Sequence, residues 1–275
     1  MGFREQALRH LANYKENILM LREDGVFVHS GREYCKPHIL PIDKLRENLL
    51  EAYRDHFFSS EHGSVKLHKY FHHLNSSQAL CINLFYPLVE EKKLGVLFKY
   101  LDIPVDDSLV PHFESESSLE VAQRRTSFDF HVRSGLRTDV YVEVKYSEDG
   151  FGGASKDAEH KGKFQETYAP LLRNSEFLMP ACADEAFFIE NYQVLRNLVH
   201  ITEKSTVVFL YPGANKAIAR QAVHAREAFL TERGRDRLRL VLLEDLVKYL
   251  ESNALPPPLA AYYSAFKAKY LGFAS

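Results

Sequence analysis

Two neighbouring stretches decide the fold of this chain: SFDFHV at residues 127–132 and TDVYVEVKY at residues 138–146. Both alternate apolar and polar side chains with a period of two, which is typical of strands that bury one face. The pair Ser134-Gly135 between them favours a tight turn. The two stretches therefore predict an antiparallel hairpin with one apolar and one polar face.

The register of this hairpin determines which charged side chains meet. With a turn centred near Leu136, Asp129 falls opposite Glu143, and Lys145 follows on the same polar face. Asp139 shares that face but lies two pairs nearer the turn, so we rank it below Asp129. Two carboxylates and an amine thus converge on one patch, and a slip of one residue would separate them.

Length and composition favour a globular protein without a general affinity for polyanions. The chain has 275 residues, of which 45% are hydrophobic, and this is enough for a sizeable core. Its net charge of -2 means that a nucleic acid would have to be held by a local basic patch. The N-terminus lacks a signal-peptide core, and the cysteines Cys35, Cys81 and Cys182 are widely separated. We expect a soluble cytoplasmic protein with free thiols and no membrane partner.

Helices are expected before the hairpin, and alternating helices and strands after it. Apolar periodicity predicts helices near 6–22, 41–58 and 75–100, the last broken at Pro87, and then near 157–174, 184–199 and 215–231. Apolar runs predict strands at 206–211 and 238–243, and the prolines at 256–258 introduce a short tail. This order predicts an α/β fold with a mixed sheet flanked by helices.

The acidic hairpin is similar to a known active-site signature. Asp129 followed on the next strand by Glu143-Val144-Lys145 resembles the PD-(D/E)XK nuclease superfamily, whose fold is restriction-endonuclease-like. The segments at 72–81, 118–120, 126–130 and 143–148 strengthen the resemblance to a bacterial branch called restriction endonucleases. Phe128 replaces the proline of the family signature, a common departure.

The resemblance implies a metal-dependent nuclease that hydrolyses phosphodiester bonds, with double-stranded DNA as the first choice of substrate. Asp129, Glu143 and the carbonyl of Val144 would hold Mg²⁺, or Mn²⁺ in its place, because these cations prefer oxygen ligands. Lys145 would orient the attacking water or stabilise charge on the phosphate. Double-strand cleavage by this fold often uses a homodimer.

Two other interpretations stay open at this stage. The same fold can act as a catalytically silent nucleic-acid-binding or assembly module. The hairpin can also be an ordinary solvent-facing surface with cross-strand charge pairs, in a domain that binds other proteins.

Four residues outside the hairpin are further candidates. Glu120 precedes the Asp129 strand and is a candidate catalytic residue that would contact the metal or its water, with a solvated surface acid as the alternative. Lys163 lies on the helix after the hairpin and is a candidate phosphate contact, although a solvated helix face would carry the same residue. Asn75 and Gln78 are candidate substrate contacts at the start of the 75–100 helix.

The domain organisation expected from these features is a single domain over residues 1–275. Residues 1–62 would be a helical N-terminal addition, residues 63–250 the nuclease-like core, and residues 251–275 a C-terminal tail.

Overall fold

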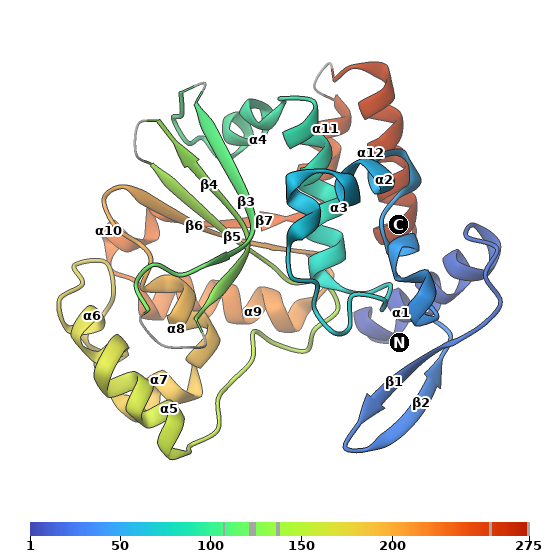
Figure 1. Cartoon of the computed structure of the whole chain (residues 1–275). Helices are drawn as coiled ribbons and strands as arrows, with labels where there is room; N and C mark the ends of the chain where they lie inside the picture. The colour runs from blue at the N-terminus through green and yellow to red at the C-terminus, as the bar shows by residue number, and fades with distance from the viewer. Residues whose placement is uncertain (107, 121–124, 136–137, 253–254, 274–275) are drawn as a thin grey trace. The chain divides into compact units, whose positions relative to one another are not determined.

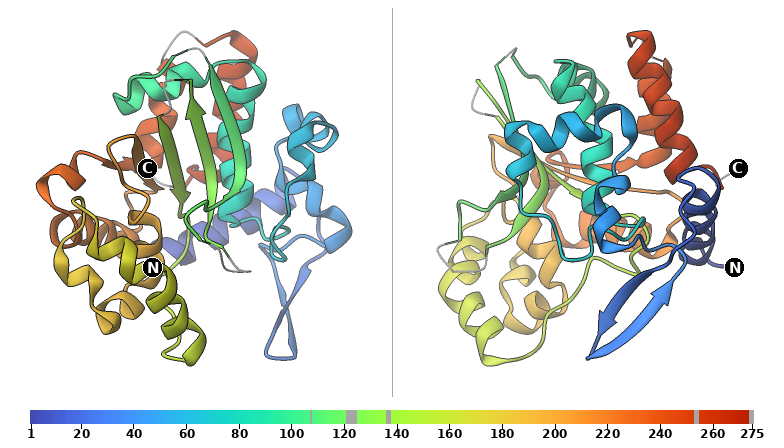
Figure 2. Two further views of the ribbon diagram at one scale, coloured as in Figure 1. Left: turned by 60° about the vertical axis from the view of Figure 1, so that its left-hand side comes forward. Right: turned by 45° about the vertical axis from the view of Figure 1, so that its right-hand side comes forward.

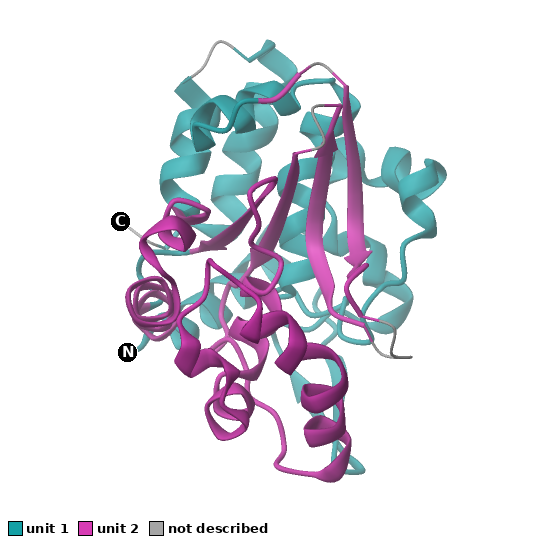
Figure 3. Cartoon of the chain, turned by 90° about the vertical axis from the view of Figure 1, so that its left-hand side faces the viewer, with its two compact units in different colours: residues 1–104, 212–215, 242–275 teal, residues 105–211, 216–241 magenta. Residues whose placement is uncertain are grey.

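The computed structural model describes residues 1–106, 108–120, 125–135, 138–252 and 255–273. The chain is divided into two compact units (Figure 3). Unit 1 comprises Met1–Pro104, Pro212–Asn215 and Leu242–Ser275, and unit 2 comprises Val105–Tyr211 and Lys216–Val241. The single domain with a boundary after residue 62 stays a prediction.

A five-stranded mixed sheet forms the centre of unit 2. Its strands, in spatial order, are β3 (Leu109–Glu116), β4 (Ser127–Ser134), β5 (Asp139–Val144), β6 (Ser205–Tyr211) and β7 (Leu238–Leu242). The β3–β4 and β4–β5 pairs are antiparallel and the β5–β6 pair is parallel. Figure 1 and Figure 2 show β3, β4 and β5 side by side. The predicted α/β fold with a mixed sheet and flanking helices is confirmed.

The apolar face of the predicted hairpin is part of the core. Phe128, Phe130 and Val132 on β4 are 0–1% exposed, and Val140 and Val142 on β5 are 1% and 2% exposed. Burying side chains of this size contributes about 1.5–3 kcal/mol each. That apolar layer sets which face of the hairpin carries the polar residues. The expected turn centre, Leu136, lies outside the described residues.

The helices of unit 2 gather beside the end of the sheet where β4 begins (Figure 1). They are α5 (Ala158–Lys163), the π-helical turn η3 (Phe164–Tyr168), α6 (Ala169–Arg173), the 3₁₀ turn η4 (Pro180–Ala183), α7 (Glu185–Glu190), α8 (Tyr192–Leu198), α9 (Lys216–His224), the π-helical turn η5 (Ala225–Phe229) and α10 (Glu232–Arg235). Asp157 and Asp184 cap α5 and α7 by accepting bonds from the N–H groups of His160 and Phe187. The helices expected near 157–174, 184–199 and 215–231 are therefore present, each divided into shorter segments.

Unit 1 is largely helical and includes a two-stranded sheet. Its elements are α1 (Phe3–Asn17), β1 (Gly25–His29), β2 (Arg32–Lys36), the 3₁₀ turns η1 (Ile42–Asn48) and η2 (Glu61–Ser64), α2 (Glu51–Ser59), α3 (Ser77–Glu90), α4 (Leu94–Leu101), α11 (Leu243–Ser252) and α12 (Pro257–Tyr270). The helix expected over 41–58 is thus a 3₁₀ turn followed by α2.

The break expected at Pro87 was wrong, because α3 continues past it to Glu90. A proline inside a helix leaves the carbonyl four residues earlier without its usual donor. In α3 that carbonyl belongs to Asn83, and the hydroxyl of Tyr262 donates to it at 2.6 Å. The helix tolerates Pro87 because a side chain from α12 replaces the missing N–H.

The expected tail after the prolines is the helix α12. Pro257 stands at its start, where the absent N–H costs nothing. Tyr262, Tyr263, Phe266 and Tyr270 recur at helical spacing and are 0–4% exposed. A helix that buries aromatic side chains so completely is part of the packed core of unit 1, not a tail.

Two further expectations concern the thiols and the membrane. The three cysteines are free, with Cys35 exposed and Cys81 and Cys182 buried. Within the part of the chain that the structure describes, no helix combines the length and apolar character needed to cross a bilayer.

Candidate active site

The hairpin register places Asp129 opposite Glu143. β4 and β5 pair Phe130 with Val142, so the next position on each strand is occupied by an acid. At this end of the hairpin the backbone N–H of Val144 donates to Oδ2 of Asp129 at 2.7 Å. Glu143 is 3% exposed and Asp129 is half-buried. The register predicted from the turn is therefore confirmed.

Lys145 completes this acidic pair with a cation. Its Nζ lies 2.8 Å from Oε1 of Glu143, and the side chain is 11% exposed. The amide Nε2 of Gln193, from α8, donates to the same oxygen at 3.2 Å. The backbone N–H of Lys145 donates to the carbonyl of Leu210 on β6 at 2.9 Å. The strand β6 and the helix α8 thus hold the Glu143–Lys145 pair in place.

Lys145 carries its proton in this environment. Burial by itself would lower the pKa of Lys145, but the nearby carboxylates of Glu143, Glu148 and Asp129 outweigh it, so the pKa is raised above its ordinary value. The side chain can therefore supply positive charge and N–H donors, and it is not suited to accept a proton at neutral pH.

A third carboxylate, Glu114, extends the row of acids to β3. The pairs that flank it join Phe113 to Phe130 and Ser115 to Phe128, so Glu114 stands across from Asp129. Its φ angle of 50° falls in the left-handed region, which is uncommon for a glutamate in a strand. The sequence gives Glu114 no role in the site, because its position depends on the β3–β4 register and no turn between those strands indicates it.

The pKa of Asp129 reports how closely these acids are grouped. Burial, followed by the charges of Glu143 and Glu114, raises the pKa well above its ordinary value, while Lys145 and the N–H of Val144 oppose the shift. Ionising Asp129 beside the carboxylates of Glu143 and Glu114 is thus unfavourable.

The chemistry of this donor set fits a hard divalent cation. Asp129 and Glu143 supply carboxylate oxygens, and a cation between them would offset both the burial and the repulsion from Glu143 that raise the pKa of Asp129. Since N–H and C=O of one strand residue point to the same side, the carbonyl of Val144 faces the strand that carries Asp129. Among the described residues, no three His, Cys, Asp or Glu side chains are grouped to hold a metal by themselves. A site here would thus use two acids, a carbonyl and water.

Asp139, on the same face, belongs to a separate ion cluster. Its Oδ1 lies 2.7 Å from Nε2 of His131 and 2.9 Å from Nε of Arg133. The ring of His131 stacks on Tyr141, with the centroids 4.5 Å apart. These contacts give Asp139 a role in joining the two strands near the turn.

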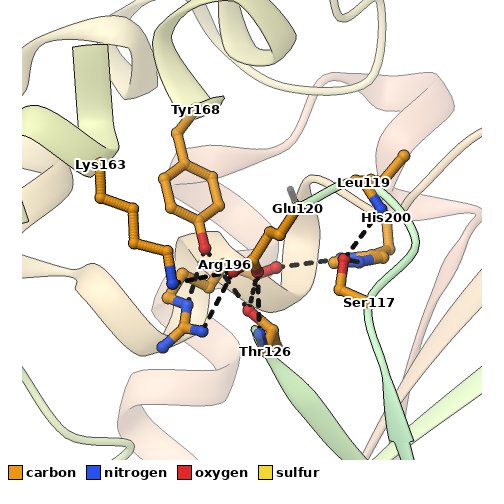
Figure 4. Close-up of polar contacts among 8 residues, drawn as sticks. All are labelled: Ser117, Leu119, Glu120, Thr126, Lys163, Tyr168, Arg196 and His200. Atoms are coloured by element: carbon orange, nitrogen blue, oxygen red, sulfur yellow. Dashed lines mark hydrogen bonds and ion pairs between the residues drawn. The ribbon is translucent and has the colours of Figure 1, made fainter. Parts of the chain in front are cut away.

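Glu120 lies in a second polar cluster, which Figure 4 shows. Its side chain is fully buried, and Oε2 lies 2.9 Å from Nζ of Lys163 and 3.5 Å from Nη2 of Arg196. Its Oε1 accepts hydrogen bonds from the backbone N–H and the hydroxyl of Thr126. The hydroxyl of Tyr168 accepts a bond of 2.8 Å from Nε of Arg196. The structure therefore pairs Glu120 with Lys163, two residues that the sequence placed in different roles.

The charge of this cluster follows from its contacts. Burial would raise the pKa of Glu120, but its bonds with Thr126, Lys163 and Tyr168 and the charge of Arg196 lower it to about 2. Burial also raises the pKa of Tyr168. It lowers the pKa of His200 to about 4, and His200 is hydrogen-bonded to Ser117 at the edge of the cluster. At neutral pH the two cations therefore face a single carboxylate.

One cleft borders the Glu120 cluster and reaches Gln193, the hydrogen-bond partner of Glu143. It has a volume of about 730 Å³ and is lined by α5, the η3 turn and α8. Gln193, which holds Glu143, lines this cleft, as do Lys163 and Arg196, which hold Glu120. The sequence predicted no role for Gln193 and Arg196, because no local pattern links α8 to Glu143 or Glu120, which lie 50 and 76 positions earlier.

Asn75 and Gln78 belong to unit 1. The amide of Gln78 accepts a bond from the N–H of His68 and donates one to the carbonyl of Lys66, so both of its ends fix this loop. Asn75 is half-buried and directly precedes Ser76, the N-cap residue of α3. The role of both residues in substrate binding stays a prediction.

Comparison with known proteins gives the family of this chain. A family model described as Restriction Endonuclease associating with ARP matches residues 8–271. The chain belongs to this family. The family match covers both units and supports a restriction-endonuclease-like protein, while membership in the PD-(D/E)XK superfamily stays a prediction. No curated protein and no solved structure matches the chain.

Proposed function

We propose that this protein is a Mg²⁺-dependent nuclease of the PD-(D/E)XK type that hydrolyses phosphodiester bonds in double-stranded DNA. The observation that carries the proposal is the placement of Asp129 opposite Glu143, with Nζ of Lys145 2.8 Å from Glu143. Membership in a restriction-endonuclease family supports the same chemistry. A cytoplasmic location and homodimerisation are part of the proposal.

Each residue of the hairpin site has a separate role in this proposal. Asp129, Glu143 and the carbonyl of Val144 would hold the cation, which supplies charge neutralisation and an acidified water. Lys145 donates N–H bonds and positive charge towards the phosphate as negative charge develops on its oxygens. Gln193 keeps Glu143 oriented through its bond of 3.2 Å, as residues behind a metal ligand commonly do.

A second candidate function is a silent module on the same fold. It is favoured by one observation, because the ammonium of Lys145 already lies against the carboxylate that a cation would need. If this ion pair outlasts the addition of metal, the protein would bind nucleic acid or assemble with a partner without cutting. The family description names association with ARP, and such a partner is compatible with either function.

Plasmid cleavage in Mg²⁺ tests the proposal. We expect nicking or linearisation by the wild-type protein, none in chelator, and a loss of at least about 100-fold in Asp129→Asn and Lys145→Met. Asp139→Asn is the matched control, since it changes an aspartate of the same hairpin face that bonds to His131 and Arg133. Full cleavage by Asp129→Asn would refute the assigned site, and DNA binding without any cleavage by the wild type would favour the silent module.

A further inference from the structure

The cations of the Glu120 cluster point into the cleft and not only toward their buried partner. Lys163 and Arg196 both line the 730 Å³ cleft, and their side chains are 11% and 17% exposed. Glu120 has no exposed side-chain surface. An anion entering the cleft would therefore meet the two cations before the carboxylate behind them.

Arg196 retains hydrogen-bonding capacity on the cleft side. Its Nε bonds Tyr168 and its Nη2 approaches Glu120, and within the described part of the chain Nη1 takes no partner. Figure 4 shows Nη1 directed away from Glu120 and on the same side as the ammonium of Lys163. The guanidinium lies over the ring of Tyr192 at 4.9 Å, which fixes its plane. A fixed fork and a neighbouring ammonium suit a phosphate group.

The local charge favours an anion even though acids also line the cleft. Glu159 and Glu166 are exposed, so water screens their charges. Lys163, Arg196 and Glu120 are screened far less and together carry one net positive charge. The partners of Glu120 hold it ionised, so it keeps both cations in position without cancelling them.

We propose that Lys163 and Arg196 form a phosphate subsite that binds a backbone phosphate flanking the scissile bond, and that Glu120 is the positioning residue behind them. This inference rests on the proposed nuclease function, because the same cleft is lined by Gln193, which bonds the active-site residue Glu143. The subsite would hold the DNA backbone irrespective of base sequence. It also gives Glu120 a role other than that of a metal ligand.

Binding of a fluorescent DNA duplex in Ca²⁺, which keeps cleavage from obscuring the result, tests the subsite. We expect Lys163→Met and Arg196→Met each to weaken binding about tenfold and to reduce the slope of log affinity against log salt by about 0.9. Methionine preserves the apolar stems, so packing is retained. Lys161→Met and Arg173→Met, which change exposed residues of α5 and α6, should bind like the wild type.

Three further results decide the assignment. Inorganic phosphate should displace the duplex from the wild type better than chloride at equal ionic strength, and this difference should shrink in the two variants. Duplexes with and without a 5′-terminal phosphate should bind equally, since dependence on the end would contradict a backbone subsite. In Glu120→Gln, the Mn²⁺ concentration for half-maximal cleavage should be unchanged, whereas an increase of tenfold or more would make Glu120 a metal ligand.

The two proposals fail in different ways. Unchanged affinity and salt slope in both cation variants, with normal cleavage by the wild type, would overturn the subsite and leave the nuclease intact. Loss of binding in both variants, with no cleavage by the wild type, would support backbone phosphate binding by Lys163 and Arg196 and overturn the nuclease.

Discussion

Glu120 is a fully buried carboxylate whose ionised form is stabilised by Thr126, Lys163 and Arg196. The pKa of this group falls from 4.5 to about 2 on folding. A carboxyl with a depressed pKa in the folded state stabilises the fold fully above its unfolded pKa, and this contribution is lost as the pH falls toward the folded pKa. The Glu120 cluster should therefore weaken between about pH 4.5 and pH 2.

Replacing Glu120 by glutamine should lower the free energy of unfolding by about 3 kcal/mol near neutral pH, because the half-buried cations Lys163 and Arg196 lose their counter-charge. The difference from the wild type should narrow as the pH approaches 2, where the wild-type carboxyl is protonated. Urea unfolding at a series of pH values measures this. Glu166→Gln, at an exposed position of the nearby η3 turn, should change stability by less than about 0.5 kcal/mol. A Glu120→Gln variant as stable as the wild type at neutral pH would contradict this prediction.

At the scale of elements, the glycine loop between β5 and α5 supports the active site through α8. Gly152 has a φ angle of 105°, and a Cβ there would lie 2.9 Å from Oε1 of Gln193. Gln193 is the side chain that donates to Glu143. Gln193 on α8 thus connects the glycine loop to Glu143 on β5.

Gly152→Ala should therefore lower both stability and cleavage. The strained backbone costs about 1 kcal/mol, and displacing Gln193 from Glu143 should reduce cleavage about tenfold with a higher Mg²⁺ requirement. Gly153→Ala is the control, because its nearest contact would be an ordinary 3.8 Å to the carbonyl of Glu190. Equal cleavage by the two variants would show that the loop does not act through Gln193.

The elements also show which features a sequence can predict. Asp129 and Glu143 lie on strands that are close in sequence, so alternation and the expected turn position predict their register, and the structure agrees. Glu114 and Gln193 reach the same place through long connections, and no local pattern specifies those pairings. The prolines before α12 were interpreted as a tail, although proline at a helix start and apolar residues three and four apart indicate a helix.

For the whole molecule, unit 2 contains every residue of the proposed chemistry described above. The sheet supplies Asp129 and Glu143, and Lys145 directly follows β5. The helices α5 and α8 supply Lys163 and Arg196. The family match covers unit 1 as well, so both units belong to the family architecture. The α/β class was predictable because helices and strands alternate along the chain, whereas the division into units depends on contacts between distant segments.

The central claim is that Asp129 and Glu143 hold a divalent cation at the end of the β4–β5 hairpin. Crystals of the protein soaked in Mn²⁺ test it most directly, because anomalous scattering locates this metal. The account predicts a peak about 2 Å from a carboxylate oxygen of Asp129 and of Glu143 and from the carbonyl of Val144, with Lys145 turned away from Glu143. A saturating soak that leaves the Lys145–Glu143 pair closed, with no peak between the two acids, would contradict it.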